Sequence, residues 1–129
     1  MAIPDCPSSP NCVSTVAGNP RRRLSSLRFQ TSIEEARAAA REILLSMPRA
    51  RLVTQEQDYL HLEFRSRFFQ FVDDVELAFD ASRGRIDFRS ASRQGYYDFG
   101  VNRRRMKKMI RRLIRRPGIS MWTGNRSGR

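Results

Sequence analysis

The chain of 129 residues has one histidine, two cysteines and no apolar stretch long enough to cross a membrane. A membrane-spanning helix needs about 20 consecutive apolar residues, so none is expected. His61 lies far in sequence from Cys6 and Cys12, which leaves a four-ligand zinc site incomplete. His61 also falls in a predicted strand with no identifiable Ser or Cys partner for nucleophilic catalysis. We therefore expect no metal site, no cofactor and no catalytic residue.

The N-terminus lacks the basic start and long apolar stretch of a secretory signal. As the chain stands, this predicts a cytoplasmic protein, and a cell-envelope or periplasmic location is the alternative if a leader is missing. The compartment decides the state of the two cysteines. Cys6 and Cys12 can form a disulfide in an oxidising compartment, and they stay free thiols in a reducing one.

Acidic residues are missing from residues 99–129, which contain eleven Lys and Arg side chains. Residues 1–98 hold fourteen basic and thirteen acidic side chains, so nearly all of the net charge of +12 lies in the C-terminal segment. A concentrated positive charge attracts nucleic acid, anionic lipid or an acidic protein. The charge distribution therefore indicates an anionic partner for this segment.

The length and a hydrophobic content of 40% are typical of one globular domain. Residues 1–31 show no clear period and predict an extended N-terminal arm. A helix is predicted from Ser32, which can cap it, to the residue before Pro48, because apolar residues recur at helical spacing between them. A second amphipathic helix is predicted from about 101 to 116, and residues 118–129 are expected to form a flexible basic tail.

Between the two helices the apolar residues recur with a period of two, which is typical of strands half-buried in a sheet. The predicted strands are 50–56, 58–66, 73–80 and 85–92, with 68–72 either continuing the second strand or forming a bulged edge. Two helices with apolar stripes need one sheet face to cover. We therefore predict a two-layer α+β domain over residues 32–117, an antiparallel meander of about four strands with both helices on one face.

The last two predicted strands can form a hairpin, and charge favours one register over another. One register places Glu76 opposite Arg89 on the outer face. A shift by two residues places Glu76 opposite Asp87, and two like charges facing each other cost stability. We therefore predict the first register, which also sets Asp73 opposite Ser92.

Three blocks of sequence are shared with a known family: "CPSSPNCVST" at 6–15, "DDVEL" at 73–77 and "RSASRQGYYDFGVNRRRM" at 89–106. The chain resembles the domain of unknown function 1499 family, which comprises uncharacterised bacterial and plastid-associated proteins. The resemblance spans nearly the whole chain and implies no activity. The signature positions, as they stand in this sequence, are Cys6, Pro7, Pro10, Asn11, Cys12, Asp73, Asp74, Glu76, Arg89, Ser90, Ser92, Arg93, Gly95, Asp98, Gly100, Asn102, Arg103 and Arg105.

The second block contains three carboxylates, and two hypotheses account for them. Carboxylates can act as an acid–base pair or bind a hard metal ion. Asp74 and Glu76 share one strand face, with Asp73 on the other, so the three do not converge on one site. Arginines at 89 and 93 lie close to the first pair in the predicted hairpin. This local positive charge favours the second hypothesis, in which the carboxylates form cross-strand ion pairs.

The third block contains the parts of an anion site. Serine hydroxyls, arginines and the N-terminus of a helix bind phosphate or carboxylate groups, and glycines let the backbone approach a ligand closely. The alternative is structural: Arg93 pairs with Asp98 and holds the connection between strand and helix. The candidate ligand-binding residues are Arg89, Ser90, Ser92, Arg93, Gly95, Asn102, Arg103 and Arg105.

Nine of the fourteen residues from 103 to 116 are Lys or Arg. Such a helix can pack its apolar face on the sheet and still bind anionic lipid or nucleic-acid phosphates with its basic face. We therefore expect a non-catalytic protein that binds an anionic ligand or an anionic membrane or envelope surface. The alternatives are a nucleic-acid-associated protein without sequence preference and an enzyme acting on a small anionic substrate. The sequence does not define the oligomeric state.

Overall fold

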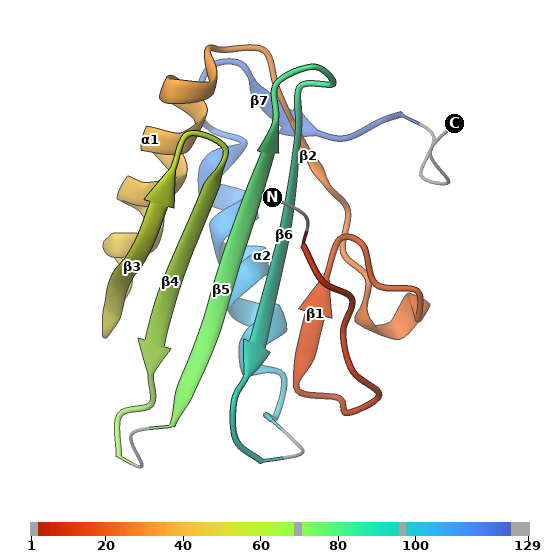
Figure 1. Ribbon diagram of the computed structural model, residues 1–129, viewed down its shortest axis with the longest axis vertical. Helices are drawn as coiled ribbons and strands as arrows, with labels where there is room; N and C mark the ends of the chain where they lie inside the picture. The colour runs from red at the N-terminus through yellow and green to blue at the C-terminus, as the bar shows by residue number, and fades with distance from the viewer. Residues whose placement is uncertain (1–2, 69–70, 96–97, 125–129) are drawn as a thin grey trace.

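The structure is a computed structural model that describes residues 3–68, 71–95 and 98–124. It has two layers, a sheet of seven strands and two helices that cover one face of this sheet (Figure 1). All the strand pairings are antiparallel, and β1 (Cys12–Ser14) pairs with β6 beside β2. The other strands, in spatial order, are β3 (Ala50–Glu56), β4 (Tyr59–Arg65), β5 (Val72–Asp80), β6 (Arg85–Ser92), β2 (Leu27–Phe29) and β7 (Ile119–Met121).

The α+β class, the antiparallel sheet and the two helices confirm the prediction, but the expected number of strands was wrong. The meander β3–β6 corresponds to the four predicted strands. The three additional strands, β1, β2 and β7, have three residues each. A three-residue strand is too short to show an alternating pattern, and these strands are defined by the backbone partners they find in β6 and in each other.

The additional strands lie outside residues 32–117, to which the sequence assigned the domain. β1 and β2 come from residues 1–31, together with a short 3-10 helix, η1 (Pro20–Arg22), and β7 comes from residues 118–129. β7 continues the sheet beyond β2 through three residue pairs. The described parts of both terminal segments therefore supply the edge of the sheet next to β6.

The first helix, α1 (Ile33–Leu45), begins where the sequence predicts and ends two residues before the predicted end at Met47. The Ser32 hydroxyl accepts a hydrogen bond from the backbone N–H of Glu35 at 3.1 Å, which satisfies one of the free donors of the first turn. Helical residues stop at Leu45, three positions before Pro48. The buried face consists of Ala36, Ala39, Ala40, Ile43 and Leu44.

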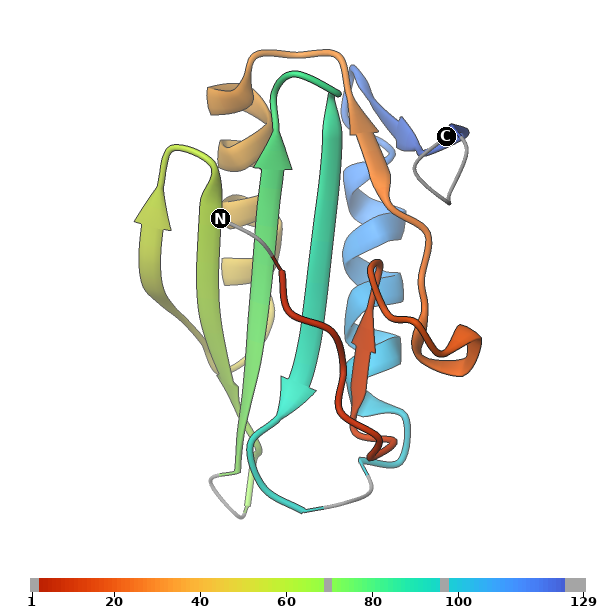
Figure 2. The same ribbon diagram turned by 45° about the vertical axis from the view of Figure 1, so that its right-hand side comes forward.

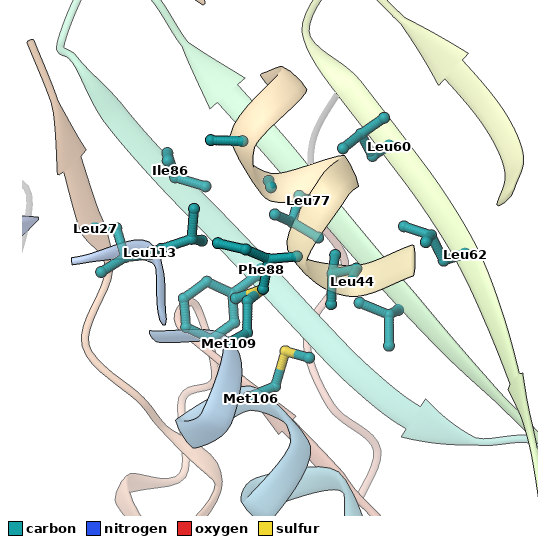
Figure 3. Close-up of a cluster of buried hydrophobic side chains, with 14 of the residues drawn as sticks. Leu27, Leu44, Leu60, Leu62, Leu77, Ile86, Phe88, Met106, Met109 and Leu113 are labelled. Atoms are coloured by element: carbon teal, nitrogen blue, oxygen red, sulfur yellow. The ribbon is translucent and has the colours of Figure 1, made fainter. Parts of the chain in front are cut away.

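The second helix, α2 (Val101–Leu113), buries a narrow apolar stripe and exposes its basic residues. Met106, Met109 and Leu113 are fully buried, and they meet the side chains of β6. Figure 3 shows side chains of both helices converging on Phe88 and Leu77, which project from the middle of the sheet. The helix ends at Leu113, three residues earlier than predicted, because the chain turns there toward β7.

The hairpin of β5 and β6 has the register that charge pairing predicted. Glu76 lies opposite Arg89, and Asp73 lies opposite Ser92. Because side chains alternate along a strand, Asp73 projects toward the helices and Glu76 projects away from them. This register therefore divides the carboxylates of the strand between the two sides of the sheet.

The face of the sheet opposite the helices is crossed by the segment that precedes β1 (Figures 1 and 2). At the far edge of the sheet, the pairing of β3 with β4 changes register between Leu52 and Thr54, which marks a β-bulge. The meander therefore has an irregular outer strand on one side and short, added strands on the other.

Gly84, in the turn between β5 and β6, generates a prediction about stability. Its φ of +64° is unfavourable for any residue with a Cβ, and an added Cβ would lie 2.7 Å from the carbonyl oxygen of Phe29 in β2. We expect Gly84→Ala to lower the free energy of unfolding by more than about 2 kcal/mol, because strain and overlap act together.

Gly95 provides the matched control, since its φ is +75° and an added Cβ would meet nothing within 4 Å. Gly95→Ala should cost only the backbone strain, about 1 kcal/mol. Urea denaturation of the two variants measures the difference. Equal losses of unfolding free energy would show that overlap with the Phe29 carbonyl adds nothing to the cost of a Cβ at position 84.

Candidate functional site

The helix side of the sheet holds a buried polar network centred on Asn102, in the first turn of α2. Asn102 and Ser90 are fully buried. The Asn102 Oδ1 atom accepts hydrogen bonds from the Ser90 hydroxyl at 2.5 Å and from the guanidinium of Arg105 at 3.0 Å. Its Nδ2 atom lies within 3.2 Å of three acceptors, on Asn11, Ser92 and Asp98. The amide therefore joins the N-terminal segment, β6 and α2.

Arg105 extends this network to β5. Its guanidinium donates to the Asp73 carboxylate at 2.9 Å and to the Ser90 hydroxyl at 3.2 Å. The same group lies 4.5 Å from the centre of the Phe64 ring, in cation–π geometry. The side chains of Arg105 and Asp73 are only 13% and 14% exposed, so this ion pair is largely withdrawn from water.

Asp98 caps the N-terminus of α2. Its carboxylate accepts hydrogen bonds from the backbone N–H groups of Gly100 at 2.8 Å and of Asn102 at 3.1 Å. A carboxylate at this position also complements the positive end of the helix dipole. Gly100, with a φ of +77°, turns the chain into the helix. The carbonyl of Gly95, earlier in the same loop, accepts a hydrogen bond from Asn11 at 2.7 Å, which ties the loop to the N-terminal segment.

The face of the sheet opposite the helices, which we call the open side, carries a second set of polar residues. They form ion pairs between β4, β5 and the end of β6. Arg93 donates to Asp74 at 2.7 Å and to Glu63 at 2.5 Å. His61 lies 2.7 Å from Asp74. Arg51, on β3, donates to the other oxygen of Glu63 at 3.0 Å. We call these five residues the outer charge cluster.

The pKa values of the outer charge cluster reflect this pairing. Hydrogen bonds from Arg51 and Arg93 hold the pKa of Glu63 below its ordinary value of 4.5. Burial opposes ionisation of Asp74, but hydrogen bonds from Arg93 and His61 outweigh burial and lower its pKa. The same pairing raises the pKa of Arg93, through Asp74 first and Glu63 second. All three groups are therefore charged at neutral pH.

Next to this cluster, Tyr59, Glu76 and Arg89 form a separate group on the same face. The Tyr59 hydroxyl donates to Glu76 at 2.6 Å, and burial together with this bond raises the pKa of Tyr59. Arg89 lies 3.5 Å from the other Glu76 oxygen. The Glu76 carboxylate is thus shared between a phenol and a guanidinium.

The candidate anion-binding residues do not converge on one site. Arg89 and Arg93 lie on the open side of the sheet, paired with Glu76 and with the outer charge cluster. Ser90, Ser92, Asn102 and Arg105 lie on the helix side and bind one another. The Arg103 guanidinium bonds the backbone carbonyl of Arg21. Most of these candidate side chains therefore have their partners within the described part of the chain, although the Arg89 Nε atom is buried without one.

The predicted pairing of Arg93 with Asp98 is wrong. Arg93 directly follows the end of β6 and projects to the side of the sheet opposite the helices, so it reaches carboxylates on β4 and β5. Asp98 lies beyond the turn and bonds the first backbone amides of α2. The sequence did not predict that Asp73 pairs with Arg105. Arg105 lies on a helix and Asp73 on a strand, and the alternation of side chains along a strand gives no information about contacts between the two layers.

Two contributors were not among the candidate residues, although the sequence contained signals for them. Glu63 alternates with the apolar residues of β4 and therefore faces the open side, where it forms ion pairs with Arg51 and Arg93. Asn11 belongs to the first signature block, and its buried side chain links Ser9 to the Gly95 carbonyl. Tyr96 and Tyr97, in the same loop as Gly95, lie outside the described residues.

The structure joins Cys6 and Cys12 by a disulfide, with the Cα atoms 5.7 Å apart. Cys12 is fully buried at the start of β1, directly after Asn11. The bond therefore fixes the N-terminal segment next to the Asn102 network.

A hollow lies elsewhere on the open side, near the Gly84 turn. It measures about 560 Å³, and Ile3, Ala78, Asp80 and Asp87 are among the residues that line it. Asp87 already accepts hydrogen bonds from Thr15, Ser26 and Arg85, and Asp80 accepts them from the turn that follows it. Within the described part of the chain, no three His, Cys, Asp or Glu side chains are grouped closely enough to bind a metal ion.

The exposed side of α2 differs from both polar networks because its cations lack acidic partners. Lys107, Lys108 and Arg111 on the helix, and Arg115 two residues after its end, are exposed, and none forms an ion pair with a described residue. We call these four residues the cationic face. Neither α1 nor α2 has the length and apolar character that a bilayer crossing requires, and no other described segment is such a helix.

These features define a class of protein: a small two-layer α+β domain with self-paired charges on its sheet and unpaired cations on its second helix. A family model described as "Protein of unknown function (DUF1499)" matches residues 2–113. The chain belongs to this family, as its three sequence blocks indicated. A search among curated proteins matches none of them.

The Arg105–Asp73 pair generates a prediction. Arg105→Met should lower the free energy of unfolding by about 3 kcal/mol, because it leaves a largely buried carboxylate without its cation. Arg104→Met is the matched control, since this neighbouring arginine is exposed and donates only to the Phe99 carbonyl. The control should change stability by less than about 0.5 kcal/mol. Chemical denaturation measures both, and similar losses would contradict a special role for the ion pair.

The outer charge cluster predicts a dependence of stability on pH. The pKa of Glu63 is lower in the folded chain than in the unfolded chain, so its stabilisation is complete above about pH 4.5 and is lost as the pH falls through the folded-state pKa. Glu63→Gln should therefore be less stable at pH 7 and should lose less stability on acidification than the parent chain. Unfolding midpoints at a series of pH values test this, and parallel curves for the two proteins would contradict it.

Proposed function

We propose that this protein is a non-catalytic binding protein that recognises an anionic partner through the cationic face of α2. The observation that carries the proposal is the contrast between this face and the other side of the molecule. On the side of the sheet opposite the helices, Arg89 and Arg93 are each paired with a carboxylate. On the solvent side of α2 and just beyond its end, the four exposed cations have no acidic partner among the described residues.

Packing alone does not account for this arrangement. The apolar stripe of Met106, Met109 and Leu113 is sufficient to hold α2 on the sheet. Like charges three and four residues apart, such as Lys107 and Arg111, destabilise a helix by a few tenths of a kcal/mol per pair. Acidic residues on the solvent side would remove this cost. An anionic partner provides the compensating charge from outside the chain.

The buried polar network does not offer a competing small-ligand site. Ser90 and Asn102 have no exposed surface, and their hydrogen-bonding atoms are occupied by neighbours. The network instead positions the first turn of α2 against β6. This supports a function of the helix surface rather than of a pocket at the helix N-terminus.

Removing two charges from the cationic face tests the proposal. A basic residue near an anionic membrane contributes about 1 kcal/mol, so Lys107→Gln with Arg111→Gln should weaken binding to phosphatidylserine-containing vesicles roughly thirtyfold at low salt. Co-sedimentation at several salt concentrations measures the affinity. Duplex DNA and single-stranded RNA, assayed in parallel, identify a nucleic-acid partner if they bind more tightly than the vesicles.

Arg37→Gln with Arg41→Gln is the matched control. These arginines have the same spacing on α1, and they donate to the Gln57 carbonyl and the Gln55 amide rather than to acids. The control removes the same net charge from a different surface and should retain most of the affinity. If both double variants lose affinity equally, net charge and not the cationic face is responsible. If the parent chain binds none of the probes, the proposal fails.

A further inference from the structure

Two loops that are distant in sequence meet at one end of the domain. The described residues that flank the β4–β5 and β6–α2 connections lie at the same end of the sheet (Figures 1 and 2). The backbone N–H of Val72 donates to the Gln94 side chain at 3.0 Å, and the N–H of Arg93 donates to the Val72 carbonyl at 2.9 Å. These bonds hold the two loops next to each other. We call this part of the molecule the loop end.

The loop end carries the most exposed apolar side chains of the described residues. Phe68 is 78% exposed and Phe99 is 77% exposed, while Phe71 and Val101 are 48% and 39% exposed. Exposed phenylalanine rings are unfavourable in water, and a contiguous group of them marks an interaction site rather than ordinary surface. The apolar core does not need these rings, because its own cluster contains none of the four residues.

Cations lie beside two of these apolar side chains, Val101 and Phe68. Arg49, Arg65, Arg104 and Lys108 line one hollow of about 210 Å³ together with Val101. The Arg67 guanidinium lies 5.4 Å from the centre of the Phe68 ring. The loop end therefore presents apolar rings within a rim of positive charge.

The carboxylates near the loop end are already engaged. Asp73 pairs with Arg105, Asp98 caps α2, and Glu63 is 6% exposed and bonded to arginines. Of the cations in the rim, Arg65 lies 3.7 Å from Glu63, and Arg49, Arg67, Arg104 and Lys108 form no ion pair with a described residue. The surface that a partner meets at this end is cationic and apolar together.

We propose that the loop end docks into an anionic lipid bilayer, with the rings of Phe68 and Phe99 entering the interface and the rim cations contacting lipid headgroups. This rests on the proposed function and specifies its partner. Aromatic side chains concentrate at membrane interfaces, and basic residues beside them bind anionic headgroups. A single-stranded nucleic acid is held in a positively charged groove with aromatic platforms, whereas these rings lie on protruding loops.

Docking by the loop end has a geometric consequence for α2. The helix rises about 1.5 Å per residue, so Arg111 lies about 10 Å farther from the bilayer than Arg104 if the helix stands upright on the surface. Electrostatic attraction in physiological salt decays over about 8 Å. Arg104 and Lys108 should then contribute more to vesicle binding than Arg111, so docking by the loop end predicts a smaller loss for Lys107→Gln with Arg111→Gln than the roughly thirtyfold loss expected when the whole cationic face lies on the membrane.

Tryptophan probes test this docking directly. With Trp122→Phe as background, Phe68→Trp and Phe99→Trp each place one fluorophore at the loop end. We expect both to shift to shorter wavelength, and to be quenched by brominated lipid, when phosphatidylcholine vesicles containing phosphatidylserine are added. Pure phosphatidylcholine vesicles should give neither effect. Trp122 in the parent chain is the internal control, because it follows β7, stacks against Arg85 and should stay unquenched.

Truncation of the rings provides the affinity measurement. Phe68→Ala with Phe99→Ala should lower affinity for the anionic vesicles about tenfold or more. Val53→Ala with Met121→Ala is the control, since these exposed apolar residues lie on the outermost strands, β3 and β7, and should leave the affinity unchanged. Unfolding midpoints equal to that of the parent chain show that the variants are folded.

The outcomes separate this inference from the proposed function. Quenching at positions 68 and 99, with the affinity loss, supports loop-end docking. Salt-dependent binding to anionic vesicles or nucleic acid without quenching or affinity loss at these positions overturns it and leaves the cationic face as the binding surface. Absence of binding to every anionic probe overturns both.

Discussion

The position of α2 depends on the hydrogen-bonding requirements of one buried amide. Asn102 has no access to water, so each of its polar atoms must find a partner within the chain. Those partners come from the N-terminal segment, from β6 and from the loop before the helix. An error in any of these elements would leave a buried donor or acceptor unpaired. The network therefore sets the register of the first helical turn, and the apolar stripe then places the rest of α2 on the sheet.

Local patterns predicted the meander, both helices and the hairpin register, because alternation, capping and cross-strand charge act over a few residues. Ser32 capping α1 and Glu76 facing Arg89 are examples. The short strands β1, β2 and β7 were not predictable, since three residues carry no period and their partners are distant in sequence. The sequence predicted which residues belong to the candidate site but not how they are arranged. The alternation of side chains along a strand placed Arg93 and Ser92 on opposite faces of the sheet. Only the folded chain shows that Arg93 binds Glu63 and that Ser92 binds the Asn102 amide.

Charge is used in two ways in this protein. Across the open sheet, acids and bases alternate between neighbouring strands, so a potential binding surface is neutralised by its own residues. Along α2 the acids are missing, and the positive charge remains available to the surroundings. The apolar rings of the loop end lie beside the start of this helix, within a rim of further cations. The sheet charges thus stabilise the fold by pairing with one another, while the exposed cations of α2 have no acidic partner among the described residues.

The two edges of the sheet limit how this chain can associate. Unpaired backbone groups on an edge strand are templates for strand addition. Here β3 carries a bulge between Leu52 and Thr54 and exposed charged residues, and the opposite edge ends in a strand of three residues. Neither edge offers a long, regular ladder to a second chain. Growth of the sheet into fibrils or swapped dimers is thereby disfavoured, and recognition is left to side chains at the surface.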